Sequence, residues 1–295
     1  MRKTLYPSAS AFCWGDAVQT EYESGCLRSI LLSAHGIRTS PPKIYMEVGA
    51  AHEDAYEQQL KKDPKVTTYR REVPVKQAIP GHDEVTYSGR VDVLAEHEGV
   101  GTVIHETKGT ISKNTRLSVI RKGKVKLNQL AQLVSYMIAL EIPRGKLVVG
   151  YYERTEDGKW VACEGREFKV TLADDGAILV DREPSGFSVI DALRHRNKAA
   201  QVLADNSIGE RPDRWNQSFG GPCTHCPFKS ACDKYDKTDT QSTEVFLGYA
   251  REALASLPDR PEPEPTLYKA PGSGRQKKPG KTSARAKQAD TETAK

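Results

Sequence analysis

The sequence predicts an α/β fold with a mixed β-sheet core flanked by helices. Segments of helical and strand character follow one another in the order αβββαβ. The strand segments alternate apolar and polar residues and end at Gly or charged residues, as half-buried strands do. A helical segment after the third strand can cross over the sheet, so that the next strand joins the same sheet.

Four segments carry apolar residues near helical spacing. The first contains Cys26 and is broken at Pro41-Pro42. The second is rich in Ala, Glu, Gln and Leu and carries His52. We expect helices at 16–36, 44–62, 124–140 and 187–205.

We expect strands at 66–77, 86–96, 101–108, 146–154 and 159–170. Together the elements predict one domain over residues 1–257. It has a helical N-terminal part at 16–62, a core at 63–170, and a C-terminal helix with a Cys-rich loop at 187–235. From Pro258 onward large apolar residues nearly vanish, which predicts a disordered basic tail at 258–295.

The net charge of +5 arises in one segment. Residues 269–287 hold seven Lys and Arg and no acid, so the rest of the chain carries about −2. No apolar run approaches the roughly 20 residues that span a bilayer, and residues 1–7 lack the apolar core of a signal peptide. We therefore expect an intracellular protein without a membrane segment, in which cysteines stay reduced unless they bind metal.

Two neighbouring strand segments carry a pair of carboxylates and a lysine. Asp92 lies in the first segment and Glu106 in the second, and Lys108 follows Glu106 by two residues. Side chains alternate along a strand, so Lys108 shares the face of Glu106. Two carboxylates and one ammonium suit a Mg²⁺ or Mn²⁺ ion that acts on a phosphodiester. Solvated strand faces are the alternative explanation.

Three cysteines form a C-x2-C-x5-C run at Cys223, Cys226 and Cys232. This spacing lets a short loop wrap one soft metal centre with several thiolates. Zinc and an iron–sulfur cluster each take four such ligands, and the spacing does not identify the fourth. Cys26 or Cys13 could complete the site from far upstream. A disulfide is the alternative that a reducing compartment disfavours.

In these motifs the chain resembles the RecB-like branch of the PD-(D/E)xK nucleases. More narrowly, it is similar to the iron–sulfur exonucleases associated with CRISPR adaptation and to their viral relatives. The segment Gly25-Cys26-Leu27-Arg28 resembles the Cys-Pro-Arg segment of that family, with Leu27 in place of the proline, which favours Cys26 over Cys13. Val48-Gly49-Ala50-Ala51-His52-Glu53 resembles its histidine motif, and Gln132 and Tyr136 match its Gln-x3-Tyr. The resemblance covers residues 20–235.

The resemblance implies a restriction-endonuclease-like core and a RecB-like nuclease domain. His52, Asp92 and Glu106 would hold Mg²⁺ or Mn²⁺ with the Thr107 carbonyl, and Lys108 would assist hydrolysis. Gln132 and Tyr136 would position Lys108 or the DNA. A [4Fe–4S] cluster would join the N- and C-terminal segments. Its ligands would be Cys26, Cys223, Cys226 and Cys232.

The implied function is a metal-dependent exonuclease acting on single-stranded DNA or overhangs, in the host cytoplasm if the protein is viral. Its partners would be a CRISPR integrase or recombination proteins. Two alternatives stay open: a non-catalytic iron–sulfur adaptor that binds DNA, and a zinc-ribbon interaction protein. Arg90 would contact a phosphate or pair with a neighbouring Glu. Lys122, Lys124 and Lys126 would line a groove for the DNA backbone or form a solvated charge run.

Overall fold

A computed structural model describes residues 3–5, 26–39, 42–209, 226–258 and 263–268. In these residues the centre is an eight-stranded sheet, ordered β1-β3-β4-β5-β6-β7-β8, with β2 paired to β3. β1 runs parallel to β3 and β4 parallel to β5, and the other pairs are antiparallel. The strands are β1 (Lys3–Leu5), β2 (Val66–Ile79), β3 (His82–His97), β4 (Gly101–Thr110), β5 (Arg144–Arg154), β6 (Trp160–Leu172), β7 (Ala177–Val180) and β8 (Glu183–Ser188).

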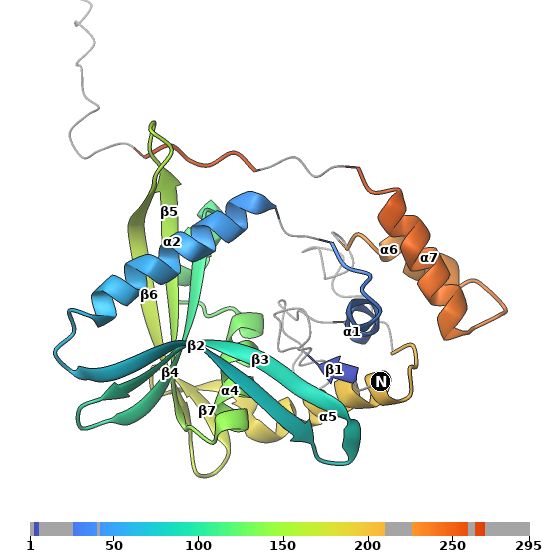
Figure 1. Cartoon of the computed structure of the whole chain (residues 1–295), viewed down its shortest axis with the longest axis horizontal. Helices are drawn as coiled ribbons and strands as arrows, with labels where there is room; N and C mark the ends of the chain where they lie inside the picture. Colours follow the sequence, from blue (N-terminus) through green and yellow to red (C-terminus); the bar gives the residue numbers. More distant parts are fainter. Residues whose placement is uncertain (1–2, 6–25, 40–41, 210–225, 259–262, 269–295) are drawn as a thin grey trace, which may run out of the picture.

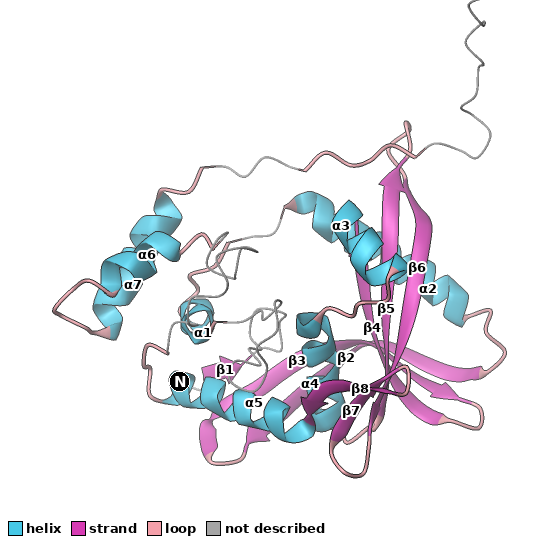
Figure 2. Cartoon of the chain, turned by 180° about the vertical axis from the view of Figure 1, so that it is seen from behind, coloured by secondary structure: helices cyan, strands magenta, loops and turns pink. Residues whose placement is uncertain are grey.

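Helices cover both faces of the sheet (Figures 1 and 2). α2 lies across one face, α4 and α5 lie on the other, and α1 lies with α6 and α7 to one side. A short π-helix, η1 (Arg116–Arg121), precedes α4. The α-helices are α1 (Leu27–Ala34), α2 (Lys43–Leu60), α3 (Lys113–Thr115), α4 (Leu127–Leu140), α5 (Val189–Ala204), α6 (Lys229–Tyr235) and α7 (Thr243–Ala255).

The main core fills the space between the sheet, α4 and α5. Helical spacing on α4 and strand alternation on β5 bring their apolar side chains together there. Each fully buried Leu or Met contributes about 1.5–3 kcal/mol relative to exposure. Fully buried members include Tyr87, Ile104, Leu130, Leu133, Met137, Tyr151 and Phe168.

α2 approaches the sheet closely because two paired strand residues have no side chain. Gly109 of β4 lies opposite Gly150 of β5. A Cβ atom at Gly109 would lie 2.6 Å from the Val48 carbonyl oxygen, and one at Gly150 would lie 2.6 Å from His52 Nδ1. The two glycines therefore set the height of α2 above β4 and β5.

A second apolar cluster joins α1 to α6 and α7. Arg28 of α1 is buried within it and pairs with Asp236 at 2.8 Å. Its Nε donates to the Gly209 carbonyl at 3.2 Å, and its guanidinium lies over the rings of Tyr235 and Phe246. The N-terminal and C-terminal segments thus pack together through apolar contacts, and the cluster that the sequence led us to expect between them stays a prediction.

The predicted mixed sheet with flanking helices is confirmed. Of the first predicted helix, residues 27–34 are helical, and residues 16–25 lie outside the described part. The helix expected from 124 begins at Leu127. The sequence reading missed β1, β7, β8, α3, η1, α6 and α7.

The prediction of a tail without structure from residue 258 is wrong for residues 263–268. Arg154 at the end of β5 donates its N–H to the Thr266 carbonyl at 2.9 Å, and its carbonyl accepts from Tyr268 N–H at 2.8 Å. Leu267 is thereby bridged to Arg154 in parallel. Backbone pairing needs few apolar side chains, so a composition argument overlooks it.

None of the helices in the described ranges combines the length and apolar content that a bilayer crossing requires.

Candidate active site at the fork of β3 and β4

Asp92 lies where the ladder between β3 and β4 ends. The last residues paired at this end are Val93 and His105. At the next position the backbone ladder stops, and the Asp92 side chain of β3 bonds to β4 instead. Its Oδ2 accepts from the Thr107 N–H at 2.7 Å and from Thr107 Oγ1 at 3.1 Å. Two donors fixed by β4 therefore orient this carboxylate.

Glu106 and Lys108 of β4 form an ion pair beside the point where the ladder between β3 and β4 ends. Glu106 is fully buried, and its Oε1 accepts from the Lys108 ammonium. Burial, with the Asp92 charge adding to it, raises the pKa of Glu106 above its ordinary value although Lys108 opposes the shift. Burial alone would lower the pKa of Lys108, but the Glu106 and Asp92 charges outweigh it and raise that pKa. The three groups thus lie close enough to influence one another electrostatically.

The second oxygen of Glu106 gives a test of whether a metal fits here. Within the described residues Oε2 is buried and has no hydrogen-bond partner. Such an oxygen is costly to bury, and a hard cation such as Mg²⁺ or Mn²⁺ would satisfy it. Asp92 supplies a second hard ligand, so these donors fit the predicted ion. In the ranges that the structure covers, no three His, Cys, Asp or Glu side chains are already gathered as a metal-binding group.

Gln132 and Tyr136 of α4 reach the same region. The Tyr136 hydroxyl accepts from the Arg90 backbone N–H at 3.3 Å, two residues before Asp92. Burial and the nearby charge of Glu106 raise the pKa of Tyr136, and a hydrogen bond to Gln132 opposes this shift. α4 therefore brings Tyr136 near the carboxylates, and Gln132 contacts Tyr136.

His52 is buried on α2 rather than exposed on a polar helix. Its ring contacts β5: Nε2 lies 3.2 Å from the Val148 carbonyl and Nδ1 lies 3.1 Å from the Tyr152 hydroxyl. Since a carbonyl only accepts, Nε2 carries the proton and Nδ1 accepts from Tyr152. Burial lowers the pKa of His52. The charge of Lys108 lowers it further, and the charge of Asp92 opposes the shift. A metal would therefore have to displace Tyr152 from Nδ1 or the proton from Nε2, and ligation by His52 stays a prediction.

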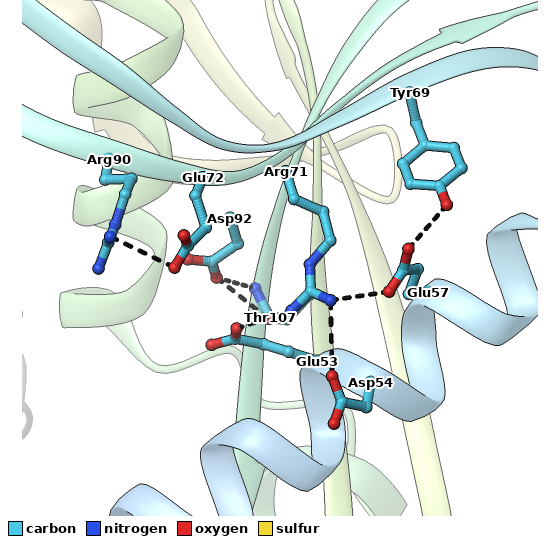
Figure 3. A network of polar contacts seen from close by, with 9 residues as sticks. All are labelled: Glu53, Asp54, Glu57, Tyr69, Arg71, Glu72, Arg90, Asp92 and Thr107. Carbon is cyan, nitrogen blue, oxygen red and sulfur yellow. Dashed lines mark hydrogen bonds and ion pairs between the residues drawn. The ribbon is translucent and has the colours of Figure 1, made fainter.

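Glu53, next to His52, is a candidate that the sequence reading did not assign. Figure 3 shows its side chain reaching toward Asp92 and Thr107. Burial and the charge of Asp92 raise its pKa. Its Oε2 accepts from Arg71 of β2 at 3.2 Å. An acid adjacent to the histidine was the only sequence signal for this role, and it is a weak one.

Arg71 fixes α2 relative to β2 (Figure 3). Its guanidinium pairs with Glu57 at 2.7 Å and with Asp54 at 3.5 Å, besides its contact with Glu53. Arg90 pairs with Glu72 at 3.3 Å, and both side chains are exposed. The ion-pair alternative for Arg90 is therefore the arrangement found.

Three of the four predicted cluster cysteines are described. Cys26 lies immediately before α1 and is partly exposed. Cys226 and the buried Cys232 belong to the apolar cluster that holds α1 against α6 and α7. Cys223 and Cys13 lie outside the described residues. The structure thus brings the two cysteine-bearing segments into one region, and a metal or cluster there stays a prediction.

A comparison with curated proteins found no match. Among solved structures, "Crystal structure of SSO0001" is 17% identical with a TM-score of 0.45, over 78% of this chain and 85% of that one. "Crystal Structure of LHK-Exo in complex with dAMP" is 13% identical with a TM-score of 0.36, over 60% and 75%. The family model of the PD-(D/E)XK nuclease superfamily matches residues 41–233, and the chain belongs to that superfamily.

Proposed function

We propose that this protein is a divalent-metal-dependent deoxyribonuclease that acts as an exonuclease on single-stranded DNA or overhangs. Membership of the nuclease superfamily supports hydrolysis of phosphodiester bonds. The observation that carries the proposal is the buried, unpartnered Oε2 of Glu106 beside Asp92 and Lys108, in the part of the chain described. Such a carboxylate is expected where a cation belongs.

Asp92 and Glu106 would hold the cation, with His52 and the Thr107 carbonyl as further predicted ligands. A bound Mg²⁺ or Mn²⁺ supplies Lewis acidity and makes a coordinated water more acidic. Thr107 orients Asp92 through two hydrogen bonds. Lys108, held by Glu106, places a positive charge beside the scissile phosphate and orients the attacking water. Tyr136 and Gln132 border this position.

The test is a nuclease assay with Mn²⁺ on end-labelled single-stranded DNA. Lys108→Ala and Asp92→Ala should each lower the rate at least about 100-fold. Lys169→Ala, at an exposed lysine of β6, is the control and should keep wild-type activity. Equal activity in all four proteins would mean that the site is elsewhere.

The same assay separates catalysis from the adaptor alternative. A wild-type protein that binds DNA but does not cut it, with several metals and substrate ends, would favour the adaptor. We further infer an intracellular role in CRISPR adaptation or recombination. Detection of a complex with an integrase or with recombination proteins would test that role.

We also infer that Cys26, Cys223, Cys226 and Cys232 bind a [4Fe–4S] cluster. Packing of α1 against α6 and α7 supports this, because it brings Cys26 toward the C-terminal cysteines. Protein purified without oxygen should contain iron and sulfide and absorb visible light. Stoichiometric zinc without iron would overturn the cluster and favour a zinc site.

A further inference from the structure

The segment between β4 and α4, residues 113–126, is called the basic connector here. It contains six Lys and Arg residues and no acidic residue. It begins five residues after Lys108 and ends at Lys126, directly before the helix that carries Gln132 and Tyr136. The basic connector therefore joins two elements of the candidate active site.

Arg116 and Arg121 tie the basic connector to the sheet. Both pair with Glu164 of β6, Arg121 at 2.6 Å. Arg116 also lies over the Tyr151 ring of β5, 4.6 Å from its centroid. Tyr151 pairs with Thr110, two residues beyond Lys108 on β4. These contacts place the basic connector at the end of β4 that follows Lys108.

Lys126, the last residue of the basic connector, bonds back to a residue near its start. Its ammonium donates to Thr115 Oγ1 at 2.8 Å, and burial lowers its pKa. This half-buried lysine is therefore engaged within the connector rather than in a groove for the DNA backbone. Between these ends, Gly123 adopts φ +69°, and a Cβ atom there would lie 2.6 Å from Nη2 of Arg166. The turn at Gly123 therefore packs closely against the guanidinium of Arg166.

Lys113, Lys122 and Lys124 are the remaining basic residues. All three are exposed. Among the described residues none of them forms an ion pair with an acid. Arg116 and Arg121 pair with Glu164, and Arg116 also pairs with Glu153. The three lysines therefore leave a local excess of positive charge on a segment with fixed ends. The remainder of the chain outside the C-terminal basic segment is slightly acidic, so this excess is local.

We propose that Lys113, Lys122 and Lys124 bind the phosphate backbone of the single strand whose scissile bond lies at Lys108. Exposed ammonium groups that lack acidic partners attract phosphates and release condensed counterions when they bind. Ties at Arg116 and Lys126 hold the lysines in place before the strand arrives, which lowers the entropic cost of binding. This inference rests on the proposed function, since it concerns the substrate of that site.

The test measures binding of the full chain to a fluorescent single strand by anisotropy, in EDTA to prevent cleavage, over a range of salt. The variant replaces Lys113, Lys122 and Lys124 by Gln. Each lost phosphate contact on a single strand reduces the slope of log K against log salt by about 0.7, so the slope should become shallower by about 2. The matched control replaces the exposed Lys62, Lys65 and Lys76 by Gln, which removes the same charge, and should keep the wild-type slope.

Three outcomes would overturn the inference. In the first, the connector variant keeps the wild-type slope while Lys108→Ala abolishes cleavage, which leaves the proposed function intact. In the second, both triple variants lose the same slope, so only net charge matters. In the third, the connector variant binds duplex DNA more weakly than the wild type does but binds the single strand equally well. A wild-type protein that neither binds nor cuts DNA would instead remove the proposed function itself.

Discussion

The Asp92 carboxylate takes two hydrogen bonds from Thr107 on one of its oxygens. Thr107→Val removes the hydroxyl donor and keeps the backbone donor, so the carboxylate would lose part of its orientation. We expect roughly a 10-fold higher Mn²⁺ concentration for half-maximal activity, with little change at saturating metal. Metal titrations of the cleavage rate measure this. Thr102→Val, on the same strand but bonded to Glu96, is the control. An unchanged metal requirement would show that the Thr107 hydroxyl does not help to orient Asp92.

Glu53 and Asp54 are adjacent acids that both contact Arg71, but only Glu53 reaches toward Asp92. Glu53→Gln should therefore weaken metal binding roughly 10- to 100-fold, because the site loses a negative charge that attracts the cation. Asp54→Asn should leave it unchanged. Isothermal titration with Mn²⁺ distinguishes the two variants. Equal affinities would remove Glu53 from the site.

The sequence allowed the central sheet and the placement of Asp92 and Glu106 on neighbouring strands to be predicted, because strand alternation is a local signal. Asp92 was expected on a strand, but its bonds to Thr107 depend on where the β3–β4 ladder ends, which alternation does not reveal. The contacts of His52 depend on the closeness of α2 to β5. That distance is set by Gly150, nearly 100 residues away in sequence. Short strands such as β7 were missed because four residues carry little pattern.

Arg28 joins α1 to Asp236 and to the Gly209 carbonyl. Because the guanidinium is buried, Arg28→Ala should lower the free energy of unfolding by about 3 kcal/mol. Lys234→Ala removes the exposed pair with Glu252 and should cost less than about 1 kcal/mol. Urea unfolding of both variants provides the measurement. Similar small losses would mean that α1 is held by its apolar contacts alone.

His105 is fully buried and bonded to Tyr56 and His97. Burial, reinforced by the charges of Lys146 and His97, lowers its pKa to about 3, whereas an unfolded histidine has a pKa of about 6.5. Between about pH 3 and pH 6.5 the unfolded state therefore binds a proton at His105 that the folded state does not. The contribution of neutral His105 to the free energy of unfolding is complete above about pH 6.5. It is lost as the pH falls below that value, by about 1.4 kcal/mol per pH unit.

His105→Gln should remove this component of the pH dependence. Urea unfolding at several pH values from 7 to 4 gives the difference in stability between wild type and variant. That difference should shrink as the pH falls. Tyr56→Phe removes a partner but no titrating group in this range, so it should lower stability evenly across the series. A constant difference for His105→Gln would show that the histidine protonates equally in both states.

Gly109 and Gly150 have a consequence that reaches beyond packing. They govern the separation between the sheet and the one helix that carries both His52 and Glu53. A methyl group added at Gly109 would meet the α2 backbone at Val48 and would lift the two side chains together. One added at Gly150 would push against the His52 ring itself, and in both cases every acid and base of the candidate site would still be in place. The position of α2 over the candidate site therefore depends on two residues that have no functional group of their own.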